Sequence, residues 1–121
     1  MQPLPTFVLP LCVFSGVALI ASGVPLYQRR VPPNPLFGVR LRSTMHDEAL
    51  WYDVNARAGR DLIVIGVIFL AALGGAQLIG HGWEPVWRIL GPLVLLVLGL
   101  AIETIVIMRL ARRMEAERRS T

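Results

Sequence analysis

The sequence predicts an all-α membrane protein with three transmembrane helices. Hydrophobic residues make up 55% of the 121 residues and charged residues only 17%, whereas a water-soluble domain carries about a quarter charged residues. The apolar residues lie in three long runs that contain almost no charge. A chain of this length forms one domain, so we expect residues 1–121 to be a single membrane domain.

The first apolar run covers about residues 7–27. At about 1.5 Å per residue, a helix of this length crosses the roughly 30 Å hydrocarbon layer. Its small residues are Gly16, Ser22 and Gly23. Small side chains let two helix backbones approach closely in a membrane, so we expect this helix to pack tightly on a neighbour.

The second run covers about residues 62–79 and the third about residues 86–110. Small residues recur every four positions in the second run, which predicts a close-packed helix face there. These pairs are Ala71 with Gly75, Ala72 with Ala76, and Ala76 with Gly80. Only residues 81–85 separate the two runs, so we expect an antiparallel hairpin. Trp83 and Trp87 are typical of a membrane interface.

The arginine distribution predicts the orientation, because cytoplasmic loops carry the excess of basic residues. Eleven of the twelve basic residues, all of them arginine, lie in the loop after the first run or at the C-terminal end, and the other is Arg88. We therefore expect the first loop and the C-terminus to be cytoplasmic and the N-terminus to be outside. The tail, which alternates arginine with Glu115 and Glu117, is expected to be helical and to attract anionic lipid.

The loop at residues 28–61 is unusually structured in its sequence. Pro32, Pro33 and Pro35 favour an extended backbone and exclude a helix. Gly38 allows a positive φ angle and a sharp turn. This Pro-rich segment is expected to lie on the cytoplasmic side.

A helix is expected to begin after Thr44, which has capping-box spacing to Asp47. Asp47 and Glu48 would then lie in its first turn, where negative charge favours the helix dipole. Trp51, Val54, Asn55, Ala58 and Leu62 share one face at steps of three and four residues. We expect an interfacial amphipathic helix that leads into the second span. Asn55 on this face needs partners; it either caps a loop carbonyl or ties the Pro-rich segment to the helix.

The segment VPPNPLFGVRLRSTMHDEALWYDVNARAG resembles the signature of the SdpI-type immunity protein family. The positions that match are Pro32, Asn34, Gly38, Arg40, Thr44, Asp47, Glu48, Trp51, Asn55 and Gly59. The order and spacing of ten positions make the resemblance specific, and it covers about a third of the chain. Two positions depart from the pattern: Val39 replaces an aromatic residue, and His46 stands where a capping serine is usual.

The resemblance implies a protein of the bacterial plasma membrane that gives immunity to, or senses, a membrane-active toxic peptide. The family's type member is also described as a signalling protein that holds a transcriptional repressor at the membrane. It is longer than this chain. The resemblance implies a toxic peptide and a cytoplasmic repressor as partners, while the apolar runs and the small-residue faces add the lipid bilayer and a second copy of the chain.

Glu103 lies inside the third run, and an ionisable residue in a membrane span is a candidate functional residue. We expect it to form an ion pair with Arg40, Arg57 or Arg60. Two other functions remain open: a small transporter or channel subunit with Glu103 lining the pathway, and an intramembrane hydrolase using Glu48 and Glu103. The sequence contains no nucleophile–base pair, phosphate-binding loop or metal-ligand motif. We therefore expect no catalytic residues, metal or cofactor, and no nucleic-acid binding.

Overall fold

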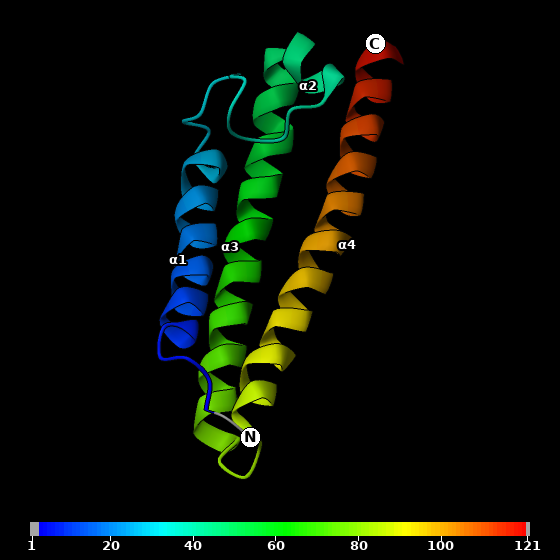
Figure 1. The fold of residues 1–121 in the computed structure, drawn as a ribbon. Helices are drawn as coiled ribbons and strands as arrows, with labels where there is room; N and C mark the ends of the chain where they lie inside the picture. The colour runs from blue at the N-terminus through cyan, green and yellow to red at the C-terminus, as the bar shows by residue number, and fades with distance from the viewer. Residues whose placement is uncertain (1–2, 121) are drawn as a thin grey trace.

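The structure is a computed structural model that describes residues 3–120 (Figure 1). It contains four helices: α1 (Val8–Tyr27), α2 (Arg42–His46), α3 (Glu48–Ile79) and α4 (Pro85–Ser120). Helices α1, α3 and α4 are long and apolar enough to cross a membrane. The predicted all-α class with three candidate spans is confirmed, and the protein is a multi-pass membrane protein. The short helix α2 was not predicted.

Helix α3 is central, with α1 packed along one side and α4 along the other (Figure 1). Helices α3 and α4 form the expected hairpin, joined by residues 80–84. Loop 28–41, α2 and the C-terminal turns of α4 lie together at the opposite end from this hairpin turn. Helices α3 and α4 both extend beyond the apolar runs at this end.

Helices α1 and α3 approach closely through glycines. A Cβ atom on Gly59 would lie 2.5 Å from the Gly23 carbonyl oxygen, and one on Gly66 would lie 3.0 Å from the Gly16 carbonyl oxygen. The contact predicted for Gly16 and Gly23 is thus confirmed. Close packing was also predicted for the small residues at positions 71–80. This prediction is wrong at Gly75, where an added Cβ would meet nothing within 4 Å. The close approach lies nearer the start of α3, where the glycines are seven residues apart.

Two clusters of buried apolar side chains hold the helices together. At the loop end, Leu50, Val54 and Ala58 of α3 pack with Ile107 and Ala111 of α4. At the hairpin end, the buried cluster joins all three long helices through Cys12, Phe69, Leu73 and Ile89. Most apolar side chains on the outer faces are exposed, which is the arrangement expected of a protein whose solvent is lipid.

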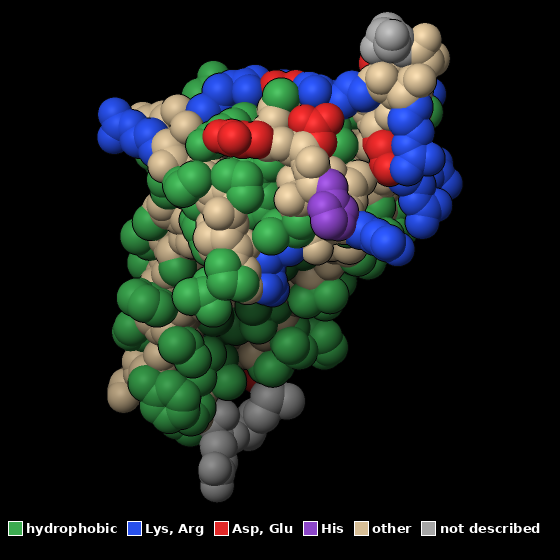
Figure 2. Space-filling view, turned by 90° about the horizontal axis from the view of Figure 1, so that it is seen from above, with side chains coloured by type: hydrophobic (Ala, Val, Ile, Leu, Met, Phe, Trp, Pro, Cys, Tyr) green, Lys and Arg blue, Asp and Glu red, His purple; other side chains and the backbone are tan. Residues whose placement is uncertain are grey.

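Charged side chains are concentrated at one end. Figure 2 looks down on this end and shows arginine and acidic side chains gathered mainly along the upper and right-hand parts of the visible face, with hydrophobic side chains over much of the remainder of that face. Arg88 is the one arginine near the hairpin turn. This asymmetry places the loop, α2 and the tail at a single polar end of the molecule.

Candidate functional site: the loop cap on α3

Residues 28–47, which we call the loop cap, fold back over the first turns of α3. The loop contains no regular structure before α2. Side chains of α3 and of the loop itself therefore supply most of the partners for its backbone groups. The cap is the part of the chain that resembles the family signature, so its geometry decides what the signature residues do.

Trp51 anchors the start of the loop. Its side chain is fully buried, and the indole Nε1–H donates a hydrogen bond of 2.8 Å to the carbonyl oxygen of Val31. A buried indole N–H needs such a partner. Trp51, rather than Asn55, is thus the residue that ties the Pro-rich segment to the helix.

Asn55 holds the end of the loop. Its Oδ1 atom accepts a hydrogen bond of 2.5 Å from the Val39 backbone N–H, and its Nδ2 group donates to the Trp51 carbonyl oxygen at 3.0 Å. A longer bond of 3.5 Å joins Nδ2 to the Val39 carbonyl oxygen. The Asn55 amide therefore forms hydrogen bonds with backbone groups of both the loop and the helix. Although the residue is only 2% exposed, both its oxygen and its nitrogen have partners.

Gly38 lets the loop pass directly over these two side chains. Its φ angle is 109°, as the predicted sharp turn requires. A Cβ atom there would lie 2.8 Å from Asn55 Oδ1 and 3.0 Å from Trp51 Cη2. Glycine is needed for its backbone angle and for the space it leaves.

Asn34 folds the Pro-rich turn on itself. Its Oδ1 atom accepts from the backbone N–H groups of Leu36 and Phe37, at 2.9 and 2.8 Å. Its Nδ2 group donates to the carbonyl oxygens of Pro32 and Phe37. One amide thus satisfies four backbone groups in a segment whose prolines cannot donate. The Arg40 guanidinium donates to the Pro35 carbonyl oxygen and closes the same turn.

The predicted Thr44–Asp47 capping box is wrong, because two helices meet where one start was expected. Thr44 lies inside α2, where its fully buried hydroxyl accepts from the Leu41 N–H at 2.9 Å and is within donating distance of the Val39 carbonyl oxygen. Asp47 is instead the N-cap of α3, and its carboxylate accepts from the Leu50 N–H at 3.0 Å. A single aspartate therefore starts the helix.

Ion pairs connect the cap to the long helices. Arg118 of α4 pairs with Asp47 at 3.2 Å and with Asp53 at 3.0 Å, and Arg29 pairs with Asp53 at 2.8 Å. We call these four residues the ion-pair cluster. Arg118 lies 71 positions from Asp47 and 65 from Asp53, so the sequence pattern did not reveal these ion pairs; the excess of arginine in the loop and tail was the only signal.

The structure brings most of the signature residues together. Those that contact one another or the cap backbone are Pro32, Asn34, Gly38, Arg40, Thr44, Asp47, Trp51 and Asn55. Gly59 lies two turns further along α3 from Trp51, in the contact with α1. Glu48 is exposed and has no ion pair within residues 3–120.

A family model described as the SdpI/YfhL protein family matches residues 30–109. This chain belongs to that family. The match includes nearly all of the loop cap, the whole of α3 and most of α4, so the resemblance first visible in residues 32–59 extends over two thirds of the chain. Comparison with curated proteins and with solved structures finds no match.

Glu103 lies inside the segment shared with the SdpI/YfhL family, but its predicted pairing with an arginine of the loop is wrong. Arg57 and Arg60 both pair with Asp61 instead, at 3.1 and 3.2 Å. Glu103 lines a groove of about 240 Å³ together with Asp61, and its Oε1 atom is buried without a hydrogen-bond partner among the described residues. Asp61 pairs with both arginines and also lines the groove of Glu103. The two arginines are therefore bound to Asp61 and do not form the ion pair that was expected with Glu103.

Proposed function

We propose that this chain is a membrane-embedded immunity or sensor protein that protects a bacterium against a membrane-active toxic peptide. Membership of the SdpI/YfhL family, which includes immunity proteins, is the observation that supports this most strongly. The three candidate spans agree with a protein that meets such a peptide within the bilayer. No bound peptide is needed to account for the fold of the cap.

The proposed orientation places the loop cap and the C-terminal turns of α4 in the cytoplasm and the hairpin turn outside. The excess of arginine at the cap end supports it. In this orientation, the polar first turns of α3 lie at the cytoplasmic interface and continue into the second span.

The signature residues act in this proposal as one rigid element. Trp51 and Asn55 fix the two ends of the loop, and the ion-pair cluster joins the loop to α4. A peptide that displaces α4 within the membrane would therefore break contacts of Arg118 with the cap. Such a change would carry the signal to a cytoplasmic regulator, such as a repressor held at the membrane.

A toxin-challenge assay tests the proposal. Cells of a sensitive strain expressing the chain are exposed to a secreted membrane-active peptide toxin, and survival is compared with cells carrying an empty vector. We expect protection by the wild type and its loss in Asn55→Leu, which cannot hold Val39. Leu36→Ala, in the same loop but without a buried contact, is the matched control. Equal survival of vector and wild-type cells across membrane-active peptide toxins would contradict the proposal.

A second function is supported by Glu103, whose Oε1 atom is buried beside Asp61 without a hydrogen-bond partner among the described residues. Ionisable residues inside membrane spans often mark ion pathways, so the chain would be a small transporter or channel subunit. Proton flux into liposomes containing the purified protein distinguishes the two functions. Flux that is abolished by Glu103→Gln, in a variant that still folds, would favour transport, whereas protection retained by the same variant would favour immunity.

A further inference from the structure

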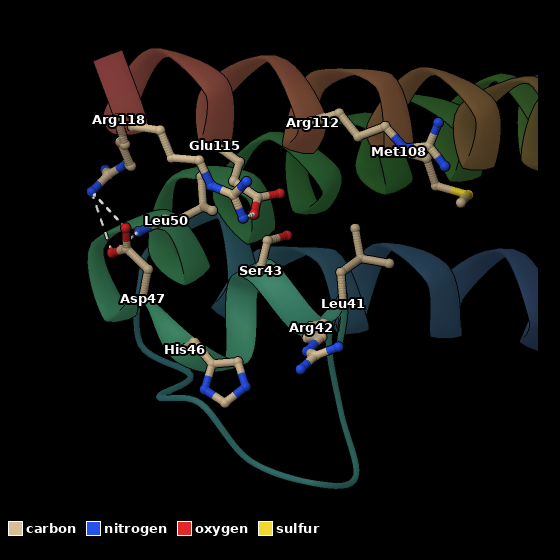
Figure 3. Close-up of a pocket in the computed structure, with 11 residues that line it drawn as sticks. Leu41, Arg42, Ser43, His46, Asp47, Leu50, Met108, Arg112, Glu115 and Arg118 are labelled. Carbon is tan, nitrogen blue, oxygen red and sulfur yellow. Dashed lines mark hydrogen bonds and ion pairs between the residues drawn. The ribbon is translucent and has the colours of Figure 1, made fainter. Parts of the chain in front are cut away.

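We infer that the cavity between α2 and the C-terminal part of α4 is a binding site for one anionic phospholipid. This inference goes beyond the proposed function and does not depend on it. The cavity has a volume of about 680 Å³ and is open to the surface (Figure 3). It lies outside the contacts of Trp51 and Asn55 that build the loop cap.

The lining of the cavity is positively charged. Four arginines and two acids line it, which leaves a net charge of +2 with His46 neutral. The charged residues are Arg42, Arg112, Arg118, Arg119, Asp47 and Glu115. Both acids already have partners, since Asp47 pairs with Arg118 and Glu115 pairs with Arg119 at 2.6 Å. The remaining positive charge therefore comes from Arg42 and Arg112.

Arg42 and Arg112 have no ion pair or hydrogen bond to any residue within 3–120. Both line the cavity, Arg42 from α2 and Arg112 from α4. Ser43, whose hydroxyl also lacks a hydrogen bond to the described residues, points from α2 toward α4 in Figure 3. Two guanidinium groups and a hydroxyl are suitable donors for a phosphate group.

Part of the lining of the same cavity is apolar. Leu41, Leu50 and Met108 belong to it, with Leu41 and Met108 toward the end away from Arg118 (Figure 3). A free inorganic anion would gain nothing from these side chains, whereas the glycerol and acyl carbons of a lipid would contact them. The lining thus fits a molecule with an anionic head and an apolar body.

The position of the cavity on α4 agrees with a lipid. The apolar part of α4 ends where Arg109 begins the charged tail, so the cavity lies at the level where hydrocarbon gives way to headgroups. Below Met108, the same face of α4 presents Ile105 and Val97, which are 55% and 63% exposed. An acyl chain that leaves the cavity can follow this face into the bilayer.

The opposite end of the cavity is closed by Arg118, which reaches across from α4 to Asp47 (Figure 3). A bound headgroup would therefore lie between α2, α4 and this ion pair. In that position it would hold α4 against the cap, where few direct contacts join α2 and α4. The lipid would act as a structural ligand at the polar end of the molecule.

Native mass spectrometry of the purified full chain in neutral detergent tests the site. Dioleoylphosphatidylglycerol is titrated against a constant background of dioleoylphosphatidylcholine. We expect one phosphatidylglycerol to bind preferentially. Arg42→Gln/Arg112→Gln should raise its apparent dissociation constant by about tenfold or more, because each arginine contributes to attraction of the anionic head.

Two further variants separate a built site from general attraction. Arg109→Gln/Arg113→Gln removes the same charge from exposed positions on α4 outside the cavity, and should change the constant by about twofold at most. Ser43→Trp fills the cavity without changing the charge, and should also weaken binding by about tenfold. All variants should melt like the wild type in phosphatidylcholine alone.

Competition with glycerol 3-phosphate and inorganic phosphate separates the sources of the anion. Neither should displace phosphatidylglycerol at millimolar concentration, because neither carries acyl chains that could contact the apolar part of the lining. Displacement by either would show a site for a soluble phosphate and would overturn the inference. An equal loss in the two arginine double variants would overturn it as well, because the attraction would then be general.

Discussion

A few side chains form most of the hydrogen bonds that hold the backbone of the loop cap. Asn34 and Asn55 together satisfy backbone groups on both sides of Gly38. Trp51 donates a hydrogen bond to Val31, in the part of the loop that follows α1. Each of these residues bonds to backbone rather than to another side chain. The loop's shape therefore depends on these three side chains and Gly38 as well as on Arg40 and Thr44, and substitutions at Trp51 and Gly38 are direct tests of the cap.

Trp51→Ala should lower the free energy of unfolding by about 3–5 kcal/mol, because it removes a large buried ring and leaves a cavity. Trp51→Phe should cost less, about 1–3 kcal/mol, since it mainly leaves the Val31 carbonyl oxygen without its donor. Reversible unfolding in mixed micelles measures both. Trp83→Ala is the control, because that ring is 53% exposed; a wild-type midpoint for Trp51→Ala would show that the ring is not buried.

Gly38→Ala should destabilise the protein by about 1–3 kcal/mol, because the φ angle of 109° is strained for alanine. The added methyl group would also press on Asn55 and Trp51. The measurement is the unfolding midpoint of the variant beside Gly82→Ala, whose added methyl group meets nothing within 4 Å. Equal midpoints for the two variants would mean that the turn tolerates a side chain.

At the scale of the helices, the contact between α1 and α3 depends on the absence of side chains. The two helices meet where glycine faces glycine, at Gly23 with Gly59 and at Gly16 with Gly66. Close backbone approach of this kind replaces the hydrophobic driving force that is missing in lipid. The contact between α3 and α4 uses larger side chains instead.

Gly59→Ala should destabilise the α1–α3 pair by about 1–3 kcal/mol, because its Cβ would lie 2.5 Å from backbone atoms of Gly23 and Tyr27. Gly75→Ala makes the same chemical change in open space on the same helix, and should change stability by less than about 1 kcal/mol. Thermal melting in detergent compares the two. A larger loss for Gly75→Ala would place the close contact elsewhere on α3.

Glu103 and Asp61 should be energetically coupled, because they line the same groove and the buried Glu103 Oε1 atom has no hydrogen-bond partner among the described residues. In a double-mutant cycle of Glu103→Gln and Asp61→Asn, the two effects should deviate from additivity by at least about 0.5 kcal/mol. The cycle of Glu103→Gln with Arg40→Ala should be additive, since Arg40 bonds within the loop. Additivity with Asp61→Asn together with coupling to Arg40→Ala would instead indicate an ion pair between Glu103 and Arg40.

The sequence predicted the helices better than the contacts between them. The predicted apolar runs agree to within one residue with both ends of α1 and with the ends of α3 and α4 at the hairpin turn, because a helix must reach a minimum apolar length to cross lipid. Four-residue spacing of small residues indicated the wrong part of α3, since spacing alone does not show which face meets a partner. Arg57 and Arg60 pair with Asp61 and not with Glu103. Which of the two acids lies nearer the arginines depends on their positions in three dimensions, which the sequence does not show.

The molecule as a whole is polarised, with the cap, the ion-pair cluster and eleven arginines at one end. The hairpin end holds exposed Trp83 and Trp87 and a single arginine. Composition predicted this polarity because basic residues are easily counted. It did not predict that α4 returns to the cap through Arg118, since Arg118 and Asp47 are 71 positions apart.

Cysteine labelling in intact cells should show this polarity across the membrane. In a Cys12→Ala background, a cysteine at Ser43 or Ser120 should be protected from an impermeant reagent added outside. A cysteine at Gly82 should react. Permeabilised cells provide the control, because all three positions should then be labelled. Labelling of Ser43→Cys in intact cells would reverse the orientation.

The hydrogen bonds of the loop cap also determine the order in which the chain can assemble during synthesis. Val31 and Trp51 are 20 positions apart, and Val39 and Asn55 are 16 apart, so these contacts close over short loops. The glycine contacts between α1 and α3 need nothing beyond Gly66. The first two spans and their cap can therefore form before α4 docks against them. Arg118 then closes the structure as the last helix docks.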